Sequence, residues 1–279
     1  MKRTVLITGC SSGIGLVTTR YLAERGVPVY ATVRSEDDAA RLNAIEGVEA
    51  FKCDVTSDDD VRALRAAIDE RGNGLWGVIH NAGIAYLGHL ATTSVEDLRT
   101  VFEVNVVGVH RLTNALVDLL IESGGRIVTM SSMSGTLSSA SMGPYSMSKH
   151  AIEAYTDSLA NELAQRGVHV CAVAPGNFAS AIVRNAVQRF APPEGGEGGV
   201  AELWEPDADT SRSRFPSPEP VAEACFAALF DDEPRSRYLV VPIAEEADRT
   251  LAQAAHEWDR LNRSSPHAWS MERLRAEIT

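Results

Sequence analysis

Short runs of β-branched and apolar residues alternate along this chain with segments of helical periodicity. Strands are expected at residues 4–7, 27–33, 49–53, 76–80, 126–130, 168–174 and 238–241, and helices at about 13–25, 35–44, 57–70, 94–122 and 144–165. Parallel strands need a crossover to return to the same edge of a sheet, and the crossover is usually a helix. The pattern therefore predicts an α/β fold, with one doubly wound parallel sheet of about seven strands.

Charge and composition narrow the class of protein. The chain has 279 residues, 38 acidic and 26 basic, with a formal net charge of −12. This balance argues against a partner such as nucleic acid or an anionic membrane, which needs a basic face. We expect one domain over residues 1–279, with an insertion at about 177–217 and a charged helical tail at about 245–279.

Targeting and metal signals are missing from the sequence. The four cysteines are widely spaced, and no Cys/His spacing suggests a metal ligand set. There is no run of 18 apolar residues, and the apolar start ends at Gly9 without a cleavage site. We expect a cytoplasmic protein with no metal and no membrane span.

A glycine-rich turn follows the first expected strand. It reads Thr8-Gly9-Cys10-Ser11-Ser12-Gly13-Ile14-Gly15. Glycines at these positions let the backbone turn tightly and approach a pyrophosphate, and the next helix begins with free N–H groups. An ordinary glycine-rich turn has a similar composition, but the place after the first strand favours dinucleotide binding in a Rossmann-type domain. The predicted contacts are Gly9, Ser11, Ser12, Gly13, Ile14 and Gly15.

The end of the second strand bears on which dinucleotide binds. An Asp or Glu there hydrogen-bonds the ribose 2′-OH of NAD, whereas this strand ends in Val33-Arg34. An arginine neutralises a 2′-phosphate, so Arg34 favours NADP(H). NAD(H) stays open, because Arg34 could equally be a solvent-facing arginine in a chain with 23 of them.

Tyr145 and Lys149 are four residues apart, and on a helix they share one face. The chain has only three lysines, so this spacing is unlike a chance surface pair. An ammonium beside a phenol favours the phenolate and lowers the tyrosine pKa, so that the tyrosine can exchange a proton with an alcohol. Ser132 ends the fifth strand, where ligands of such sheets bind, and is the candidate partner of a substrate oxygen. Ser131 is the alternative.

Together these motifs resemble the short-chain dehydrogenase/reductase family, in its T-G-x-x-x-G-x-G and Y-x-x-x-K branch. The resemblance covers about residues 4–190 and implies hydride transfer between a nicotinamide and a carbonyl carbon. It makes Tyr145 the general acid/base, Lys149 a ribose ligand, Ser132 the group that polarises the carbonyl, and Asn105 the holder of a relay water. The further cofactor contacts that it implies are Asp54, Val55, Asn81, Ala82, Gly83, Pro175, Gly176, Phe178 and Ser180.

The local sequence resembles the hydroxysteroid and retinol dehydrogenase group in particular, which implies a bulky apolar substrate. Met133, Met142 and Phe178 are the candidate lining, although they could also be ordinary core residues. The insertion would be a substrate lid. The family's habit of pairing through the long helices with Asn105 and Tyr145 implies a homodimer or homotetramer.

The sequence supports two other functions less well. A catalytically silent dinucleotide sensor with the same fold usually lacks the tyrosine or the lysine, and both are present here. A sugar-nucleotide epimerase or dehydratase has a different glycine spacing from that of Gly9, Gly13 and Gly15.

Overall fold

The computed structural model describes residues 3–190 and 215–278. The chain divides into two compact units, Met1–Pro242 and Ile243–Thr279. In the second unit, helices α9 (Ala244–Ser264) and α10 (Met271–Ile278) are separated by a break that contains Pro266. Most of the expected insertion, residues 191–214, lies outside the described residues.

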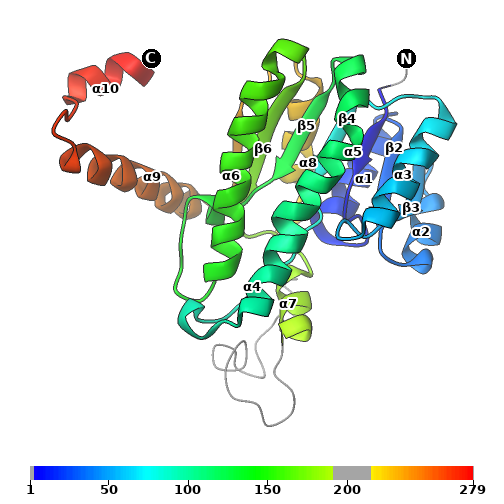
Figure 1. Ribbon diagram of the computed structural model, residues 1–279, viewed down its shortest axis with the longest axis horizontal. Coiled ribbons are helices and arrows are strands. Elements are labelled where there is room, and N and C mark those ends of the chain that lie inside the picture. The colour runs from blue at the N-terminus through cyan, green and yellow to red at the C-terminus, as the bar shows by residue number, and fades with distance from the viewer. Residues whose placement is uncertain (1–2, 191–214, 279) are drawn as a thin grey trace, which may run out of the picture. The chain divides into compact units, whose positions relative to one another are not determined.

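Seven parallel strands form one sheet in the first unit, as predicted (Figure 1). Their order is β3-β2-β1-β4-β5-β6-β7, so the chain winds outward from β1 in one direction and then, from β4, in the other. The strands are β1 (Val5–Ile7), β2 (Val29–Val33), β3 (Val48–Lys52), β4 (Gly77–His80), β5 (Arg126–Met130), β6 (His169–Pro175) and β7 (Arg237–Val240). Each neighbouring pair is parallel.

Helices connect the strands at the positions that the sequence indicates. They are α1 (Gly13–Glu24), α2 (Glu36–Asn43), α3 (Asp58–Arg71), α4 (Val95–Phe102), α5 (Gly108–Ser123), α6 (Gly143–Leu163), α7 (Ile182–Phe190) and α8 (Glu219–Phe230). Three of them begin as predicted, because Ser35, Ser57 and Ser94 each accept a hydrogen bond from the N–H three residues on. Helices α7 and α8 were not predicted.

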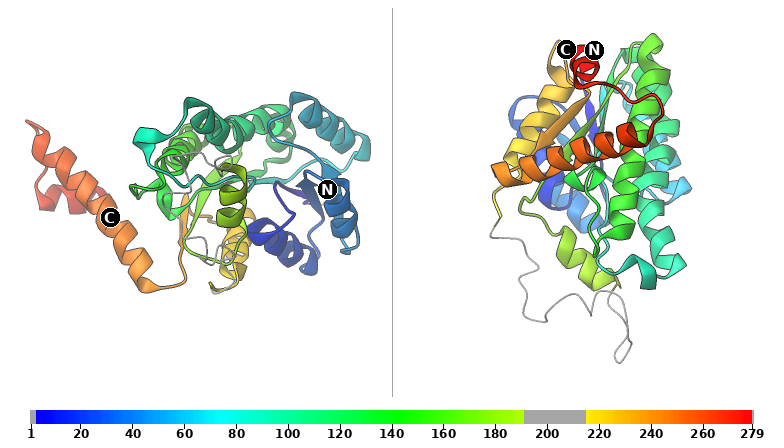
Figure 2. Two further views of the ribbon diagram at one scale, coloured as in Figure 1. Left: turned by 90° about the horizontal axis from the view of Figure 1, so that it is seen from below. Right: turned by 90° about the vertical axis from the view of Figure 1, so that its left-hand side faces the viewer.

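The side chains of the inner strands alternate between two cores. Val5 and Ile7 belong to the core on the α1 and α8 face, and Leu6 belongs to the core that contains the α3 and α5 leucines. Figure 2 shows α4, α5 and α6 on one side of the sheet and α1 and α8 on the other. Both faces of the sheet are therefore covered, which explains why every residue of β1 is buried.

Helices α4 and α5 form one continuous helical stretch through a π-helical turn at Glu103–Val107. By length and composition alone, the stretch Val95–Ser123 is apolar enough to cross a membrane. Its buried leucines, Leu112 and Leu116, instead pack in the core against the sheet. A core helix of a folded domain meets the same criterion, so this finding does not bear on membrane association.

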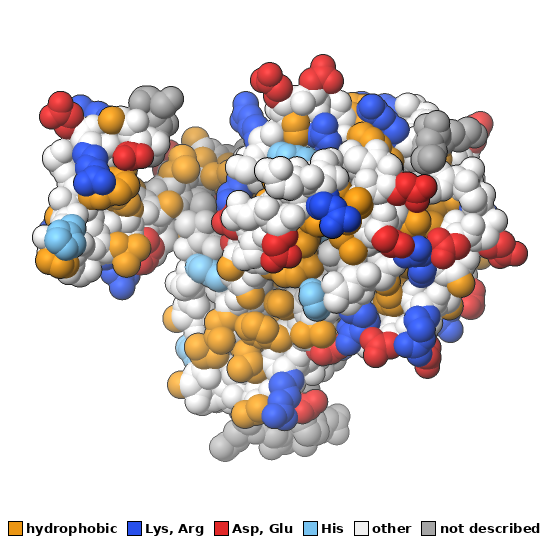
Figure 3. All heavy atoms as spheres, turned by 45° about the horizontal axis from the view of Figure 1, so that its top comes forward, with side chains coloured by type: hydrophobic (Ala, Val, Ile, Leu, Met, Phe, Trp, Pro, Cys, Tyr) orange, Lys and Arg blue, Asp and Glu red, His pale blue; other side chains and the backbone are white. Residues whose placement is uncertain are grey.

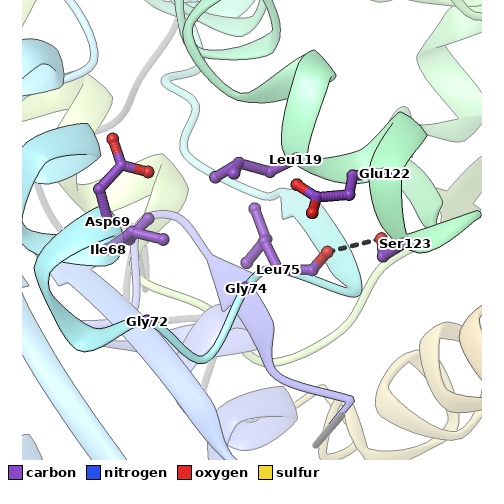
Figure 4. Close-up of a pocket in the computed structure, with 8 residues that line it drawn as sticks. All are labelled: Ile68, Asp69, Gly72, Gly74, Leu75, Leu119, Glu122 and Ser123. Atoms are coloured by element: carbon purple, nitrogen blue, oxygen red, sulfur yellow. Dashed lines mark hydrogen bonds between the residues drawn. The ribbon is translucent and has the colours of Figure 1, made fainter.

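A hollow of about 210 Å³ lies at the amino ends of the strands. Figure 4 shows it between the end of α3, the segment before β4 and the end of α5, where Ser123 Oγ donates to Leu75 O over 2.7 Å. The predicted site residues follow the carboxyl ends of the strands, at the opposite edge of the sheet. This hollow is therefore separate from them.

We expect Leu112→Ala to destabilise the first unit by about 2–5 kcal/mol, because Leu112 is fully buried and the substitution leaves a cavity. Chemical denaturation measures the free energy of unfolding. Arg20→Ala is the control: Arg20 is an exposed residue of α1, so its truncation should change that free energy by less than about 0.5 kcal/mol. Equal effects of the two substitutions would contradict the assignment of the core.

Candidate active site

The glycine-rich turn between β1 and α1 packs so closely that side chains are excluded from it. Gly9 has φ +71°, and a Cβ there would lie 2.9 Å from Ala82 Cα. A Cβ on Gly15 would lie 2.3 Å from Gly9 O. Ser12 precedes α1, and its hydroxyl does not cap that helix. The turn thus presents bare backbone and an uncapped helix start, which fit an anionic group such as a pyrophosphate.

Thr8 and Asn81 brace this turn from the ends of β1 and β4. Asn81 Nδ2 donates to Thr8 O (2.8 Å) and Gly9 O (3.1 Å), while Thr8 Oγ1 accepts from the N–H groups of Asn81 (3.0 Å) and Ala82 (2.9 Å). Both amide hydrogens of Asn81 are therefore engaged with the turn, so its side chain shapes the predicted cofactor site from behind. Sequence reasoning missed Thr8, although its place at the end of a buried strand was a usable signal.

The expected adenine end of the site lies between β3 and α3. Asp54 Oδ1 accepts from the N–H (2.9 Å) and the hydroxyl (2.7 Å) of Thr56, which stiffens the loop. Val55 packs against α5, since a Cβ on Gly108 would lie 2.8 Å from Val55 Cγ2. At the end of β2, Arg34 is exposed and makes no hydrogen bond or ion pair with any other described residue. Its charge is available to a ligand.

Lys149 and Asn105 come together with Gly83 at the carboxyl ends of β4 and β5. Asn105 lies in the π-helical turn, where its Oδ1 accepts from Ile84 N (2.8 Å) and its Nδ2 donates to Ile84 O (2.9 Å). A Cβ on Gly83 would lie 3.3 Å from Asn105 Oδ1 and 3.8 Å from Lys149 Nζ. Asn105 also donates to Ser148 Oγ (2.9 Å), a partner that sequence reasoning missed. The predicted lysine and asparagine are thus brought together.

Lys149 is a buried cation beside the predicted catalytic tyrosine. Its Nζ donates to Met130 O (2.7 Å) and lies 5.6 Å from the centroid of the Tyr145 ring. Burial lowers the pKa of Lys149 to about 8, and the Glu153 carboxylate partly offsets this effect. Glu153 is itself held by Arg237, whose Nε donates to Glu153 Oε2 over 2.6 Å.

Ser132 links the ends of β5 and β6. Its hydroxyl accepts from Ser134 N (3.1 Å) and donates to Pro175 O (3.5 Å). It is half-buried, whereas the alternative, Ser131, is 2% exposed and would be 2.7 Å from a Cβ on Gly135. The position therefore favours Ser132 as the hydroxyl that a ligand can reach.

An apolar cluster covers Tyr145. Its members come from the loop after β4, from α6 and from α7; besides Tyr145 they are Ala85, Met142, Ile182, Ala186 and Phe190. Phe190 also meets Tyr86 edge to face, with ring centroids 4.8 Å apart. Tyr145 itself is 8% exposed. Sequence reasoning missed Tyr86, which lies three residues after Gly83 of the predicted Asn-Ala-Gly motif.

The remaining predicted residues divide between this cluster and other places. Met142 belongs to the cluster, and Met133 is buried in the turn after Ser132. Phe178 packs instead in the core on the α1 and α8 face, so the structure does not bring it together with Met142. Ser180 does reach the cofactor side, because its Cβ would be 3.3 Å from a Cβ on Gly13. Gly176, which follows the buried Pro175 at the end of β6, donates from its N–H to Val240 O (2.8 Å).

The described residues hold no cluster of His, Cys, Asp and Glu that would bind a metal. All four cysteines are free and buried. In the glycine-rich turn, burial raises the pKa of Cys10 to about 12, and its thiol donates to Ile7 O (3.1 Å). Cys10 therefore fills space in the turn as an unreactive thiol.

Comparisons with known proteins agree with this geometry. A family profile described as short chain dehydrogenase matches residues 3–190. An uncharacterized oxidoreductase of Escherichia coli, YbbO, is 35% identical over 243 residues, which are 86% of each chain. Rat retinol dehydrogenase 16 is 38% identical over 62% of this chain and 56% of its own.

Among solved structures, a variant of actinorhodin polyketide ketoreductase with NADPH superimposes with a TM-score of 0.75. It is 28% identical, over 88% of this chain and 98% of that one. The glycine-rich turn, the tyrosine–lysine pair and the family match over two thirds of the chain lead to one conclusion. The chain belongs to the short-chain dehydrogenase/reductase family and is an oxidoreductase that acts on CH–OH and C=O groups.

Proposed function

We propose that this enzyme is an NADP(H)-dependent oxidoreductase that interconverts a carbonyl and a secondary alcohol on a bulky apolar molecule. The observation that carries the proposal is the meeting of Lys149, Tyr145 and Asn105 beside the bare glycine-rich turn. The proposal is supported because the pair of Tyr145 and Lys149, which could exchange a proton, lies at the same edge of the sheet as the predicted dinucleotide site.

The nicotinamide nucleotide, when bound, supplies the hydride to the carbonyl carbon or accepts it from the alcohol. In reduction, Tyr145 Oη gives its proton to the carbonyl oxygen, and Ser132 Oγ donates a hydrogen bond to the same oxygen. The ammonium of Lys149, 5.6 Å from the phenol ring centroid, stabilises the phenolate that remains. Oxidation uses the same groups in reverse.

Asn105 supports this pair through the loop after β4. Its amide holds Ile84 by both backbone groups, and Gly83 therefore stays beside Lys149 Nζ. The relay water that the family resemblance implies would lie near Lys149, where the ammonium keeps donors beyond the one engaged with Met130 O. Such a water would return a proton from solvent to Tyr145 after each turnover.

The cofactor preference rests on charge at the end of β2. Arg34 is exposed and free of other described partners, and this end of the strand carries no carboxylate. The ketoreductase structure with a TM-score of 0.75 holds NADPH. Both points favour NADP(H) over NAD(H) for this chain.

The substrate class rests on the surroundings of Tyr145. Met142, Ile182, Ala186 and Phe190 offer apolar surface and no charge. A bulky apolar alcohol or ketone gains most from such a lining. The relative named as a retinol dehydrogenase is in line with this substrate class. The dinucleotide-sensor alternative is disfavoured, because Tyr145 and Lys149 are both in place.

We further propose that the enzyme acts in the cytoplasm as a homodimer or homotetramer. Val95, Val107 and Met147 are exposed apolar residues on the helical stretch with Asn105 and on α6. Figure 3 shows hydrophobic side chains gathered in the lower half of the main body, while charged side chains of both signs are spread over its upper and right-hand parts. An exposed apolar area of this kind suits contact with a second copy.

We expect Tyr145→Phe to lower the rate of carbonyl reduction by at least about a hundredfold, because the proton donor is lost. NADPH binding, followed by fluorescence titration, should change by less than about twofold. Tyr30→Phe is the matched control: its hydroxyl is buried in β2 and has no hydrogen-bond partner among the described residues, so activity should persist. Full activity of Tyr145→Phe would refute the mechanism.

We expect Arg34→Ala to weaken NADPH binding by about tenfold to a hundredfold, because a charge-assisted contact with the phosphate is lost. NADH binding should change little. Calorimetric titration of both nucleotides makes the comparison, with Arg20→Ala, an exposed arginine of α1, as the control. Equal losses for the two nucleotides would show that Arg34 does not recognise the phosphate.

We expect Glu153→Gln to move the alkaline limb of the pH–rate profile for reduction to lower pH. Lys149 is charged below its pKa of about 8 and loses its charge above that pH. The Glu153 carboxylate raises this pKa, so its removal lowers the pKa further and the charge is lost sooner. Asp157→Asn is the control, since Asp157 also binds Arg237 (2.9 Å). An unmoved limb in Glu153→Gln would contradict this role.

A further inference from the structure

Arg41 reaches from helix α2 to the glycine-rich turn, although 30 residues separate the two in sequence. Its Nη2 donates to Ser11 O over 2.8 Å. The adjacent residue, Cys10, donates from its N–H to Thr32 O (2.9 Å), so the turn is bonded to β2 two residues before Arg34. Arg34, Ser11 and Arg41 therefore surround the same corner of the dinucleotide site.

Two acidic groups near this corner, Asp38 and Glu36, are engaged in ion pairs. Asp38 binds Arg41 Nη2 through Oδ1 (2.7 Å), and its Oδ2 accepts from Ser35 Oγ (2.9 Å). Both carboxylate oxygens are engaged, so Asp38 is not free to take a ribose hydroxyl as an acidic residue does in NAD sites. Glu36 points its carboxylate to Lys52, with 3.9 Å between Oε1 and Nζ.

Arg41 is held at one nitrogen and open at the others. Both contacts, to Ser11 and to Asp38, use Nη2, while Nη1 and Nε have no partner among the residues that the structure describes. The side chain is 56% exposed. The guanidinium is thus anchored at Nη2, while Nη1 and Nε each keep an N–H donor that can meet a phosphate oxygen singly.

We infer that Arg41 recognises the adenosine 2′-phosphate of NADP(H) from the side of the glycine-rich turn, opposite Arg34. The inference rests on the cofactor preference proposed above. It extends that preference to Arg41, a residue that lies outside the glycine-rich turn and outside the end of β2. Two arginines, one on each side, hold the phosphate more selectively than Arg34 alone, because Asp38 and Ser11 fix the orientation of the second one.

The test measures binding and not turnover. Adenosine 2′,5′-bisphosphate and 5′-AMP are titrated calorimetrically into the wild type, Arg41→Ala, Arg34→Ala and the double variant. We expect Arg41→Ala to weaken the bisphosphate by about tenfold to a hundredfold and 5′-AMP by less than about twofold. Arg62→Ala is the matched control, because Arg62 is also an exposed helical arginine paired three residues away, with Asp59.

The outcomes separate this inference from the proposed cofactor preference. If the wild type binds both ligands equally, the NADP(H) preference itself fails. If the wild type prefers the bisphosphate and Arg41→Ala keeps that preference in full, only the inference about Arg41 is overturned. Equal weakening of both ligands in Arg41→Ala would also overturn it, since Arg41 would then merely support the turn.

Discussion

Four neighbouring parallel strands end at the same edge of the sheet, and every part of the active site depends on that arrangement. The glycine-rich turn follows β1, Asn81 and Gly83 follow β4, Ser132 follows β5, and Pro175 ends β6. Parallel pairing fixes these ends side by side, and the reversal of winding between β1 and β4 leaves space above them for a ligand. The site is thus assembled from segments that are distant in sequence, and the strand that precedes each segment fixes the position of that segment.

Within this frame, the buried ammonium of Lys149 carries a desolvation cost. Burial disfavours its charge and lowers its pKa to about 8, while Met130 O, the Glu153 carboxylate and the face of the Tyr145 ring compensate in part. The same burial makes the charge effective on Tyr145, because little solvent screens the two.

Sequence patterns predicted much of this fold and the residues of the candidate site for local reasons. Strand runs, the serine caps of α2, α3 and α4, and the glycine spacing each depend on a few adjacent residues. Helix α8 was not predicted, because it is apolar nearly all round and gives no periodic signal. Helix α7 was not predicted, because it lies in the segment that was interpreted as an irregular insertion. Phe178 was predicted to line the substrate site, but its side chain packs in the core on the α1 and α8 face.

What the sequence determined by itself is the identity of the reacting groups. Tyr145 and Lys149 share a helix face by their spacing, and the glycines permit a backbone that no other residue adopts there. Only the tertiary structure decided what those groups meet. The bonds of Asn81 to the turn, of Asn105 to Ile84 and of Arg41 to Ser11 join residues 21 to 73 positions apart. Contacts across such separations depend on how elements pack, which local sequence does not encode.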